Sequence, residues 1–498
     1  MSTLPKKILV ANRGEIAVRV MRACRELGIA TVAVYSQADE QALHVRMADE
    51  AYLVGPAPSA QSYLRAEVIL DVVRQSGADA IHPGYGFLSE NAGFAQQVLD
   101  SGITWIGPSP SAIQSMGSKT ESRARMVAAG VPVVPGGTEA IPNAQEAQRI
   151  ADEMGYPVMI KAAAGGGGKG MREVTNAEDL QTAFQSAQSE ARNSFGDDDV
   201  YIEKRIIRPR HVEVQVLADQ HGNVVHVFER DCSIQRRHQK VVEESPCPVI
   251  LEETRQKMTQ VAIQAARAVE YEGAGTVEFL LAEDQSFYFL EMNTRLQVEH
   301  PITEMVTGID LVQAQIRVAS GEPLAFTQDD IIQQGHSIEC RIYAEDAQNN
   351  WAPSPGKLLS YHEPSGPWIR VDSGIGEGGE VTVFYDPMIS KLIVWGHDRQ
   401  DAIRRMRRAL HEYCILGIQT SIPFFQALLD DEEFLSGIYD TGYLTPEKMT
   451  SLTQVDSGVA DEVLAAIAIL ALERDLAKKP TQQTSSGSKW KWAHRLRQ

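Results

Sequence analysis

Two glutamates on neighbouring apolar segments are the residues of this sequence that most clearly indicate chemistry. The segments, residues 275–281 and 287–293, flank a polar turn, and the centre of that hairpin places Glu278 directly opposite Glu291. A period of two puts Asn293 on the same face. Opposed carboxylates repel each other unless a cation lies between them, and carboxylate and amide oxygens suit Mg²⁺ or Mn²⁺ that bridges the phosphates of ATP. The alternative is an edge hairpin with one solvated face.

The same alternation continues beyond the hairpin. If this stretch stays extended, one face carries Asn293, Arg295, Gln297 and Glu299. A cation, an amide and a carboxylate beside a metal form a site for a small oxyanion and the base that deprotonates it. A surface ion pair between Arg295 and Glu299 is the alternative interpretation.

A glycine-rich loop follows an expected buried strand within residues 159–172. Glycines in such a loop let backbone amides approach a phosphate closely. The loop is not a P-loop, because Lys169 is followed by glycine rather than by Ser or Thr. Lys161, inside the strand, favours phosphate binding over a flexible hairpin tip, because an unpaired buried lysine would be costly.

Basic residues gather in the segment 230–240, inside a chain of net charge −19. This local positive charge indicates an anionic ligand, with a solvated loop as the alternative. Cys232 lies in the segment without an identifiable base, and we interpret it as structural. Arg341 shares a strand face with Glu339, so a partly buried ion pair competes with any catalytic role. The residues by themselves predict an ATP- and Mg²⁺-dependent enzyme that acts on a small anion.

The elements that must position these residues change in type along the chain. Residues 7–11 and 31–35 read as strands around a helix at 15–27, and similar units follow up to about residue 106. This alternation predicts a parallel sheet with helices on both faces. The first turn lacks a Gly-x-Gly-x-x-Gly pattern, so a dinucleotide site is unsupported. Residues 156–300 read as strands joined by turns, and residues 400–413 as a basic amphipathic helix.

Composition places the chain among ordinary globular proteins. Its 498 residues include 47 Lys and Arg against 66 Asp and Glu, which predicts two to four domains and argues against nucleic acid or an anionic membrane as the partner. No apolar run reaches the roughly 20 residues of a spanning helix. The 5 cysteines are scattered without a Cys-x-x-Cys pair, which suits a reducing compartment. With no signal or transit segment, we expect a cytoplasmic protein.

Four segments together resemble the biotin carboxylases, a family of ATP-grasp ligases. They are Ala-Asn-Arg-Gly-Glu-Ile at residues 11–16, the stretch 82–91, the basic stretch 230–240, and Glu-Met-Asn-Thr-Arg-Leu-Gln-Val-Glu-His-Pro at 291–301. The resemblance extends over about residues 5–447. It implies that ATP and bicarbonate form carboxyphosphate, whose CO₂ passes to the ureido nitrogen of biotin. The glycine loop has one glycine fewer than in some relatives, which affects only the details of the lid.

The resemblance also implies the fold and its division. An α/β protein is expected, with an N-terminal Rossmann-like (pre-ATP-grasp) parallel sheet over 1–116 and an ATP-grasp domain over 117–335. Within the latter, a mobile glycine-rich lid covers about 135–203. A C-terminal α+β biotin carboxylase domain spans 336–447. Residues 448–498 are expected to be a helical and basic tail, which resembles the start of a linker in longer carboxylases. Our hypothesis is that this tail docks a carrier or transferase subunit, and a disordered, solvated tail is the alternative.

Site residues follow from the resemblance position by position. ATP binding is implied for Lys119, Lys161, Gly165, Gly166, Gly167, Gly168, Glu203, Lys204, Ile206, His211, Gln235, His238, Glu278, Leu280 and Glu291. Two Mg²⁺ or Mn²⁺ ions are implied at Glu278, Glu291 and Asn293. Bicarbonate is implied at Lys240, Arg295, Gln297 and Val298. Glu299 would deprotonate it, and Arg341 would bind biotin and stabilise its enolate-like anion. The catalytic residues are therefore expected to be Lys240, Arg295, Glu299 and Arg341.

The resemblance also implies which proteins this chain works with. The sequence contains no Ala-Met-Lys-Met-like biotinyl motif, so we expect biotin on a separate carrier protein, together with carboxyltransferase subunits. The chain is expected to form a homodimer, which Arg19 and Arg22 on the first helix make plausible. Acetyl-CoA carboxylase of fatty acid biosynthesis is the expected complex, and propionyl-CoA or pyruvate carboxylase is the alternative. A carboxylate–amine ligase of the ATP-grasp family and a non-catalytic paralogue are disfavoured by the intact Arg341 and Glu299 segments.

Overall fold

The computed structural model describes residues 4–137, 140–163 and 170–453. The predicted glycines Gly165–Gly168 and the expected helix at 461–475 lie outside these residues. Among the described helices, none is both long enough and apolar enough to cross a membrane.

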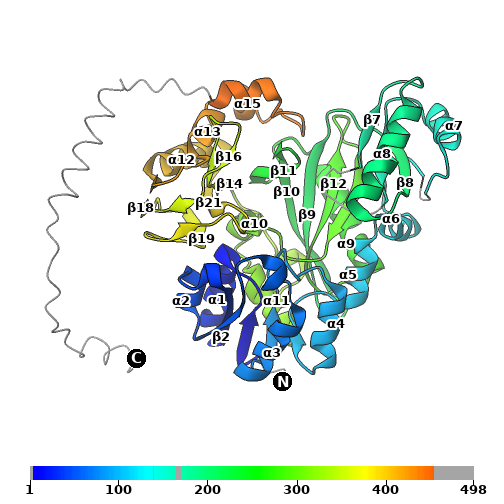
Figure 1. The fold of residues 1–498 in the computed structure, drawn as a ribbon. Helices are drawn as coiled ribbons and strands as arrows, with labels where there is room; N and C mark the ends of the chain where they lie inside the picture. Colours follow the sequence, from blue (N-terminus) through cyan, green and yellow to red (C-terminus); the bar gives the residue numbers. More distant parts are fainter. Residues whose placement is uncertain (1–3, 138–139, 164–169, 454–498) are drawn as a thin grey trace, which may run out of the picture. The chain divides into compact units, whose positions relative to one another are not determined.

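The N-terminal region is built on a five-stranded sheet of order β3-β2-β1-β4-β5, in which every pairing is parallel (Figure 1). Its strands are β1 (Lys7–Val10), β2 (Ala30–Ser36), β3 (Glu50–Gly55), β4 (Ala80–His82) and β5 (Thr104–Trp105). Its helices are α1 (Gly14–Glu26), α2 (Leu43–Met47), α3 (Ala66–Ser76), α4 (Ala92–Asp100), α5 (Pro110–Gly117) and α6 (Lys119–Ala128), with 3₁₀ turns η1 (Gln37–Asp39) and η2 (Ser59–Gln61).

Strand β1 shows why helices cover both faces of this sheet. Ile8 and Val10 pack into the core that includes α1, whereas Leu9 packs into the core formed by α3 and α4. Both sets of side chains are fully buried, as a continuous apolar run in a parallel strand requires. The predicted parallel sheet with helices on both faces is confirmed.

A small three-stranded sheet carries the strand that precedes the glycine loop. Its order is β7-β6-β8, from β6 (Val158–Ala162), β7 (Arg172–Val174) and β8 (Val200–Lys204). Helices α7 (Ala144–Met154) and α8 (Leu180–Phe195) cover it and share one apolar core with it (Figure 1). The antiparallel register sets Lys161 opposite Tyr201 and Met159 opposite Glu203.

An eight-stranded antiparallel sheet of order β13-β12-β9-β10-β11-β14-β21-β19 forms the centre of the molecule (Figure 1). Its strands are β9 (Arg210–Ala218), β10 (Val224–Arg236), β11 (Gln239–Ser245), β12 (Gly273–Leu281), β13 (Phe287–Asn293), β14 (His336–Tyr343), β19 (Ile369–Ser373) and β21 (Met388–Gly396). Because β14 pairs with β11, the sheet continues across the boundary expected at residue 336.

The side chains of strand β9 alternate between an apolar and a polar face of this sheet. Val212, Val214 and Val216 pack against helix α9 (Glu252–Ala268). The alternating residues His211 and Glu213 are equally buried but face the opposite side. Buried polar side chains need partners, so this face must hold an extended polar network.

The remaining elements complete the large sheet and the C-terminal core. They are α10 (His300–Thr307), α11 (Leu311–Ala319), η3 (Gln328–Asp330), α12 (Arg399–Glu412), α13 (Ile422–Leu428), α14 (Glu432–Ser436), α15 (Pro446–Thr453), and the short strands β15 (Glu345–Asp346), β16 (Ala352–Pro353), β17 (Gly356–Lys357), β18 (Ser360–His362), β20 (Glu380–Val381) and β22 (Cys414–Leu416). Helix α12 coincides with the predicted basic helix, and its Ala402, Met406 and Ala409 face the core.

Candidate active site

One cavity of about 560 Å³ lies between the polar face of the large sheet and the small sheet. The sequence-predicted residues that line it are Lys119, Lys161, Glu203, Lys204, Ile206, His211, Gln235, His238, Lys240, Glu278, Leu280, Glu291, Asn293, Arg295, Gln297, Val298 and Arg341. Glu299 lies directly behind Lys240 and Arg341. The fold thus gathers residues that are up to 222 positions apart in the chain, from Lys119 to Arg341.

A row of three glutamates crosses the sheet. Glu291 on β13 lies opposite Glu278 on β12, and Glu278 lies opposite Glu213 on β9. The predicted pairing of Glu278 with Glu291 is therefore confirmed. Strand β13 is an edge strand, as the alternative supposed, but Glu278 is only 3% exposed. Like charges in neighbouring registers are unfavourable, so cations must compensate them.

Lys240 on β11 is the main counter-charge. Its Nζ donates to Glu278 Oε1 and to Glu299 Oε1, each at 2.8 Å, and also to Glu213. Burial would lower the pKa of this lysine, but the three carboxylates raise it well above its ordinary value. Lys240 is thus a permanent cation that three acids share.

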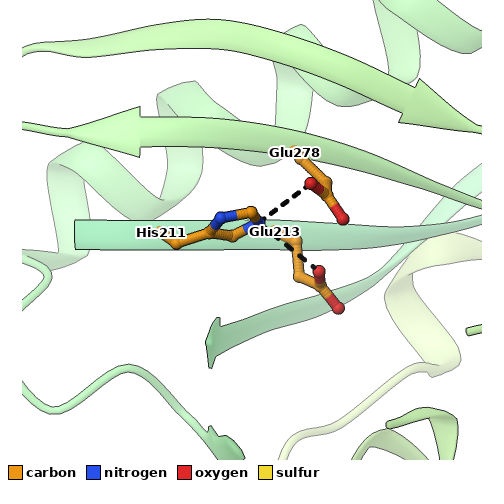
Figure 2. Close-up of side chains that lie close together, drawn as sticks. All are labelled: His211, Glu213 and Glu278. Atoms are coloured by element: carbon orange, nitrogen blue, oxygen red, sulfur yellow. Dashed lines mark ion pairs between the residues drawn. The ribbon is translucent and has the colours of Figure 1, made fainter. Parts of the chain in front are cut away.

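His211 lies against two glutamates of this row, as Figure 2 shows. Its Nε2 lies 2.9 Å from Glu278 Oε2 and 3.9 Å from Glu213 Oε2. Burial opposes protonation, yet Glu278 raises the pKa of His211. For Glu278, burial is outweighed by Lys240 and His211, which hold its pKa below the ordinary value. His211, Glu213 and Glu278 could together reach one metal ion. The contacts of Glu278 with His211 and Lys240, however, already compensate the charge of this carboxylate.

Glu291 is the less compensated end of the row. Burial and the charge of Glu278 raise its pKa, and Lys119 at the start of α6 is the first cation that opposes this shift. The amide of Asn293 donates to Glu278 Oε1 at 2.9 Å, and its Oδ1 accepts from Arg295 at 3.1 Å. The incompletely compensated charge of Glu291, beside the hard oxygen donors of Glu278 and Asn293, fits divalent ions that bridge phosphates.

The segment after β13 differs from the extended strand that the alternation predicted. The strand ends at Asn293, a turn follows, and α10 begins at His300, so this prediction is wrong. Pro301 in the first turn of α10 explains the start of the helix, because proline lacks the amide that a continuing strand would use. The side chains still converge, since Arg295 donates to Gln297 Oε1 at 3.0 Å.

Arg295 does not form the surface ion pair with Glu299 that was the alternative. Its Nε instead lies 2.9 Å from Oε2 of Glu90, which precedes α4. The other oxygen of Glu90 accepts from the Thr294 amide at 3.1 Å. Glu90 therefore fixes both the backbone and the side chain at the start of this turn.

Glu299 is completely buried between two cations. Its Oε1 contacts Lys240 at 2.8 Å, and its Oε2 accepts from Arg341 Nη2 at 3.0 Å. Burial would raise the pKa of Glu299, but Lys240 and Arg341 hold it well below its ordinary value. Arg341 is also held by Glu243, whose Oε1 lies 2.7 Å from Nε. The carboxylate is therefore ionised and oriented.

The small sheet supplies the other wall of the cavity. Lys161 forms an ion pair with Glu203, and both side chains are less than one-tenth exposed. The ammonium of Lys204 is occupied by backbone carbonyls, with Gly155 O at 2.8 Å. A cation and the edge of strand β8 thus face the glutamates across the cavity.

The basic segment 230–240 divides between core and cavity. Arg230 is fully buried and bonds Glu213, whereas His238 stands in a tight turn with φ of 66° and lines the cavity. Cys232 is buried, and burial raises its thiol pKa well above the ordinary value. A protonated buried thiol supports its interpretation as structural.

A second cavity of about 580 Å³ adjoins the first and shares Arg295, Val298 and Arg341 with it. Its other walls are residues 12–16, at the start of α1, and residues 384–386. Arg341 and Arg295 thus stand where two cavities meet, each of a size that accommodates a small molecule.

Sequence reasoning missed several groups of this site. Glu213 could have been found, because it lies two residues from His211 on the same strand face. Glu90 lies inside the stretch 82–91 that carries part of the resemblance, but no role was predicted for it. Glu243 carried no signal, because its partner Arg341 reaches it through the pairing of β11 with β14, almost one hundred residues away.

Family models match nearly the whole described chain. They are "Biotin carboxylase, N-terminal domain" at residues 4–113, "Carbamoyl-phosphate synthase L chain, ATP binding domain" at 118–327 and "Biotin carboxylase C-terminal domain" at 339–446. Biotin carboxylase 1 of Bacillus subtilis is 54% identical over 88% of this chain and 98% of its own length. A pyruvate carboxylase chain of Methanothermobacter thermautotrophicus is 58% identical over 88% and 89%.

Solved structures agree with these sequence relatives. The biotin carboxylase–beta-gamma-ATP complex from Campylobacter jejuni has a TM-score of 0.86 at 49% identity, covering 88% of this chain and 98% of that one. The biotin carboxylase domain dimer of Hydrogenobacter thermophilus 2-oxoglutarate carboxylase, in complex with MgADP, ADP and bicarbonate, has a TM-score of 0.86 at 49% identity, covering 91% and 99%.

Proposed function

This chain belongs to the biotin carboxylase family, and we propose that it transfers a carboxyl group from bicarbonate to biotin held on a separate carrier protein, at the expense of ATP. Membership makes the chain an ATP-dependent carboxylating ligase. The proposal assigns the steps of the reaction to the residues around the two cavities.

The nucleotide would lie between the small sheet and the glutamate row. Lys161 and Lys119 both line this space and would supply point charges for phosphate oxygens. Residues 203–206, at the end of β8 and directly after it, would bind the adenine, and Leu280 on β12 would line the same space. The rim would be formed by His211, Gln235 and His238. The glycines Gly165–Gly168 are proposed as the cover over the phosphates. The complexes of the Campylobacter and Hydrogenobacter proteins with ATP-type ligands support this placement.

Glu278, Glu291 and Asn293 would hold Mg²⁺, with Mn²⁺ as the alternative ion. The bound ions would neutralise the phosphate charge during transfer. Glu278 Oε1 also accepts hydrogen bonds from the amide of Asn293 and the ammonium of Lys240, so an ion would share this oxygen with both donors. The MgADP in the Hydrogenobacter structure supports Mg²⁺ as the resident ion.

Bicarbonate would bind between Lys240 and Arg295, beside Gln297 and Val298. An anion at Lys240 competes with Glu299 for the same ammonium, which lies 2.8 Å from the carboxylate. Loss of this contact raises the basicity of Glu299, so the carboxylate becomes able to accept the bicarbonate proton. The same two cations stabilise the resulting dianion as it attacks the terminal phosphate.

Biotin would enter through the second cavity, which meets the first at Arg341. This guanidinium would stabilise the negative charge on the ureido oxygen while the nitrogen attacks CO₂. Glu243 and Glu299 hold Arg341 in place before substrate arrives, so little reorganisation is needed. The pair of adjoining cavities, with Arg295 and Arg341 at their junction and Glu299 bound directly behind Arg341, is the observation that carries the proposal.

The test is ADP release by the purified chain with Mg²⁺, bicarbonate and free biotin, each omitted in turn. We expect turnover to require bicarbonate and to rise with biotin. Turnover that is indifferent to both would contradict the proposal. Repeating the assay with a biotinylated carrier protein separates an obligatory carrier from a wrong substrate.

The complex around this activity is also proposed. Relatives named for pyruvate, propionyl-CoA and methylcrotonoyl-CoA are 48–58% identical, so similarity does not select the acceptor. Acetyl-CoA stays the predicted acceptor, delivered through a carrier and carboxyltransferase subunits in the cytoplasm. The dimer of the Hydrogenobacter domain supports a homodimer here. The division at residues 116, 335 and 447, and partner docking by residues 448–498, stay proposals.

A further inference from the structure

Lys391 is a fully buried lysine that none of the proposed steps uses. It lies on β21, opposite Arg341 on β14 and Asp372 on β19. Its side chain is 0% exposed, and it lines neither of the two cavities described above. A buried ammonium is costly unless it is both paired and hydrogen-bonded, so its contacts indicate what it stabilises.

The shortest contact of Lys391 is with the turn that carries the anion site. Its Nζ donates to the backbone carbonyl of Val298 at 2.8 Å. Two carboxylates lie farther away, with Glu15 Oε2 at 3.3 Å and Asp372 Oδ2 at 3.9 Å. The ring centre of Tyr85 lies 5.9 Å from the ammonium. The lysine therefore ties the turn to α1 and to β19.

Glu15 is the nearest carboxylate to Lys391, but it is not the hydrogen-bond partner of this lysine. It stands in the first turn of α1, and neither of its carboxylate oxygens accepts a hydrogen bond from the described residues. Burial raises its pKa to about 7, and the charge of Lys391 opposes that rise. Lys391 thus directs its hydrogen bond to the neutral Val298 carbonyl rather than to the nearby acid.

The turn is held at two successive carbonyls. The Gln297 carbonyl lies 2.8 Å from Nδ1 of His300, while Lys391 holds the Val298 carbonyl. Burial keeps the pKa of His300 well below its ordinary value, so this imidazole is neutral and donates through Nδ1. Each contact fixes one peptide, so His300 holds the one that joins Gln297 to Val298 and Lys391 holds the one that joins Val298 to Glu299. The orientation of the latter peptide sets where the Val298 backbone and the Glu299 carboxylate stand.

We propose that Lys391 is a positioning residue of the bicarbonate site, which orients the Val298–Glu299 peptide from outside both cavities. The inference rests on the proposed function. Lys391 touches no substrate, and its effect reaches the reaction through the turn. A displacement of about 1 Å at such a point can cost up to a hundredfold in rate.

The experiment compares Lys391→Met with wild type in bicarbonate-dependent ADP release, nucleotide binding and calorimetric bicarbonate binding. Methionine keeps the unbranched side chain as far as Cε and removes the donor. We expect kcat to fall 10- to 100-fold, while the Kd of the nucleotide stays within twofold. Leu392→Ala is the matched control, because Leu392 lies on the same strand but packs into the C-terminal core. It should lower Tm without changing kcat per folded molecule.

Three results would overturn the inference. One is a kcat for Lys391→Met within threefold of wild type, and another is an equal loss of kcat in Leu392→Ala. If Lys391→Met does not fold, Lys391→Arg tests the inference instead, because the planar guanidinium of arginine cannot place a single donor where the lysine Nζ stands. An unchanged kcat in Lys391→Arg is the third. Wild type that neither binds nor uses bicarbonate would instead defeat the proposed function itself.

Discussion

Glu243 and Glu244 are adjacent on β11, equally buried, and opposite in electrostatic state. Glu243 faces the active site, and its Oε2 has no hydrogen-bond partner among the described residues. Burial raises its pKa to about 7, with Arg341 opposing and the charge of Glu299 adding to the rise. Glu244 points to the other face, where burial is outweighed by Arg399 and His336, which hold its pKa below the ordinary value.

The number of donors explains this difference. Arg399 binds Glu244 with two nitrogens, at 2.7 and 3.1 Å, and both His336 and the Tyr439 hydroxyl add further contacts. Arg341, in contrast, divides its donors between Glu243 and Glu299. Glu244, which lies away from the cavities, has all the donors it needs. Glu243 is left short of donors because its cation Arg341 also binds Glu299, the proposed base. Each prediction below tests this contrast.

The largest expected effect is on Glu299, which shares its arginine with Glu243. Glu299→Gln should lower bicarbonate-dependent ADP release by about 10²–10⁴-fold, because the amide cannot accept the bicarbonate proton. Steady-state assays at saturating ATP measure this loss. The matched control is Glu244→Gln, which should retain wild-type turnover per folded molecule. Equal losses in both variants would erase the distinction between the two faces.

Glu244→Gln should instead act on stability. Removal of this charge leaves Arg399 and His336 buried without their acid, which costs about 3–5 kcal/mol for a broken buried pair. Urea unfolding followed by circular dichroism measures the free energy of unfolding. A loss below about 1 kcal/mol would show that Glu244 is not the satisfied partner that its contacts indicate.

The two glutamates should also give opposite pH dependences of stability. The folded pKa of Glu244 lies below the unfolded value, so its contribution is present above about pH 4.3 and is lost as pH falls. The folded pKa of Glu243, about 7, lies above the unfolded value, so Glu243 costs stability as pH rises from about 4.3 to about 7.

Unfolding of the Gln variants at pH 5 and pH 7.5 measures this contrast. Relative to wild type, Glu243→Gln should gain about 1–3 kcal/mol between the two values. Glu244→Gln should show little change over that range and approach wild type only below about pH 4. Parallel curves for the two variants would contradict the opposite pKa directions.

The smallest expected effect is the stability of Glu243→Gln at pH 5. Because the folded pKa of this carboxyl is raised to about 7, the neutral amide replaces a group that is mostly protonated at pH 5 and should change the free energy of unfolding by only about 1 kcal/mol. Thermal and urea unfolding measure it, with Glu244→Gln as the comparison. A loss as large as that of Glu244→Gln would show that Arg341 depends on the charge of Glu243.

Local pattern predicted the parts of this molecule that depend on neighbours in the sequence. The N-terminal sheet follows from strand–helix alternation. The opposition of Glu278 and Glu291 was predicted correctly from the centre of one turn, although a register shift between Glu278 and Phe279, which the pattern did not show, is what brings the two glutamates opposite each other. The error in residues 294–299 is also local. Alternation was carried past Asn293, although Pro301 in the next helix already limited how far the strand could continue.

The partners of Glu243, Glu244 and Lys391 could not be predicted in the same way. Glu243 and Glu244 are identical in type and adjacent, and only the pairing of β11 with β14 decides which arginine each one meets. Lys391 reaches Val298 from a strand that is more than ninety residues away in the chain. Such contacts depend on sheet order, which no periodicity of a single segment encodes.

The two walls of the active site stand on separate sheets, with Lys161 on the three-stranded sheet and Lys240, Glu299 and Arg341 on or beside the eight-stranded one. Under the proposed function, this arrangement separates two kinds of mutation. Damage to β6 or β8 would weaken nucleotide binding, so a high concentration of ATP would restore activity. Damage to β11, β14 or the turn after β13 would lower the maximal rate itself, so no concentration of any substrate would restore it.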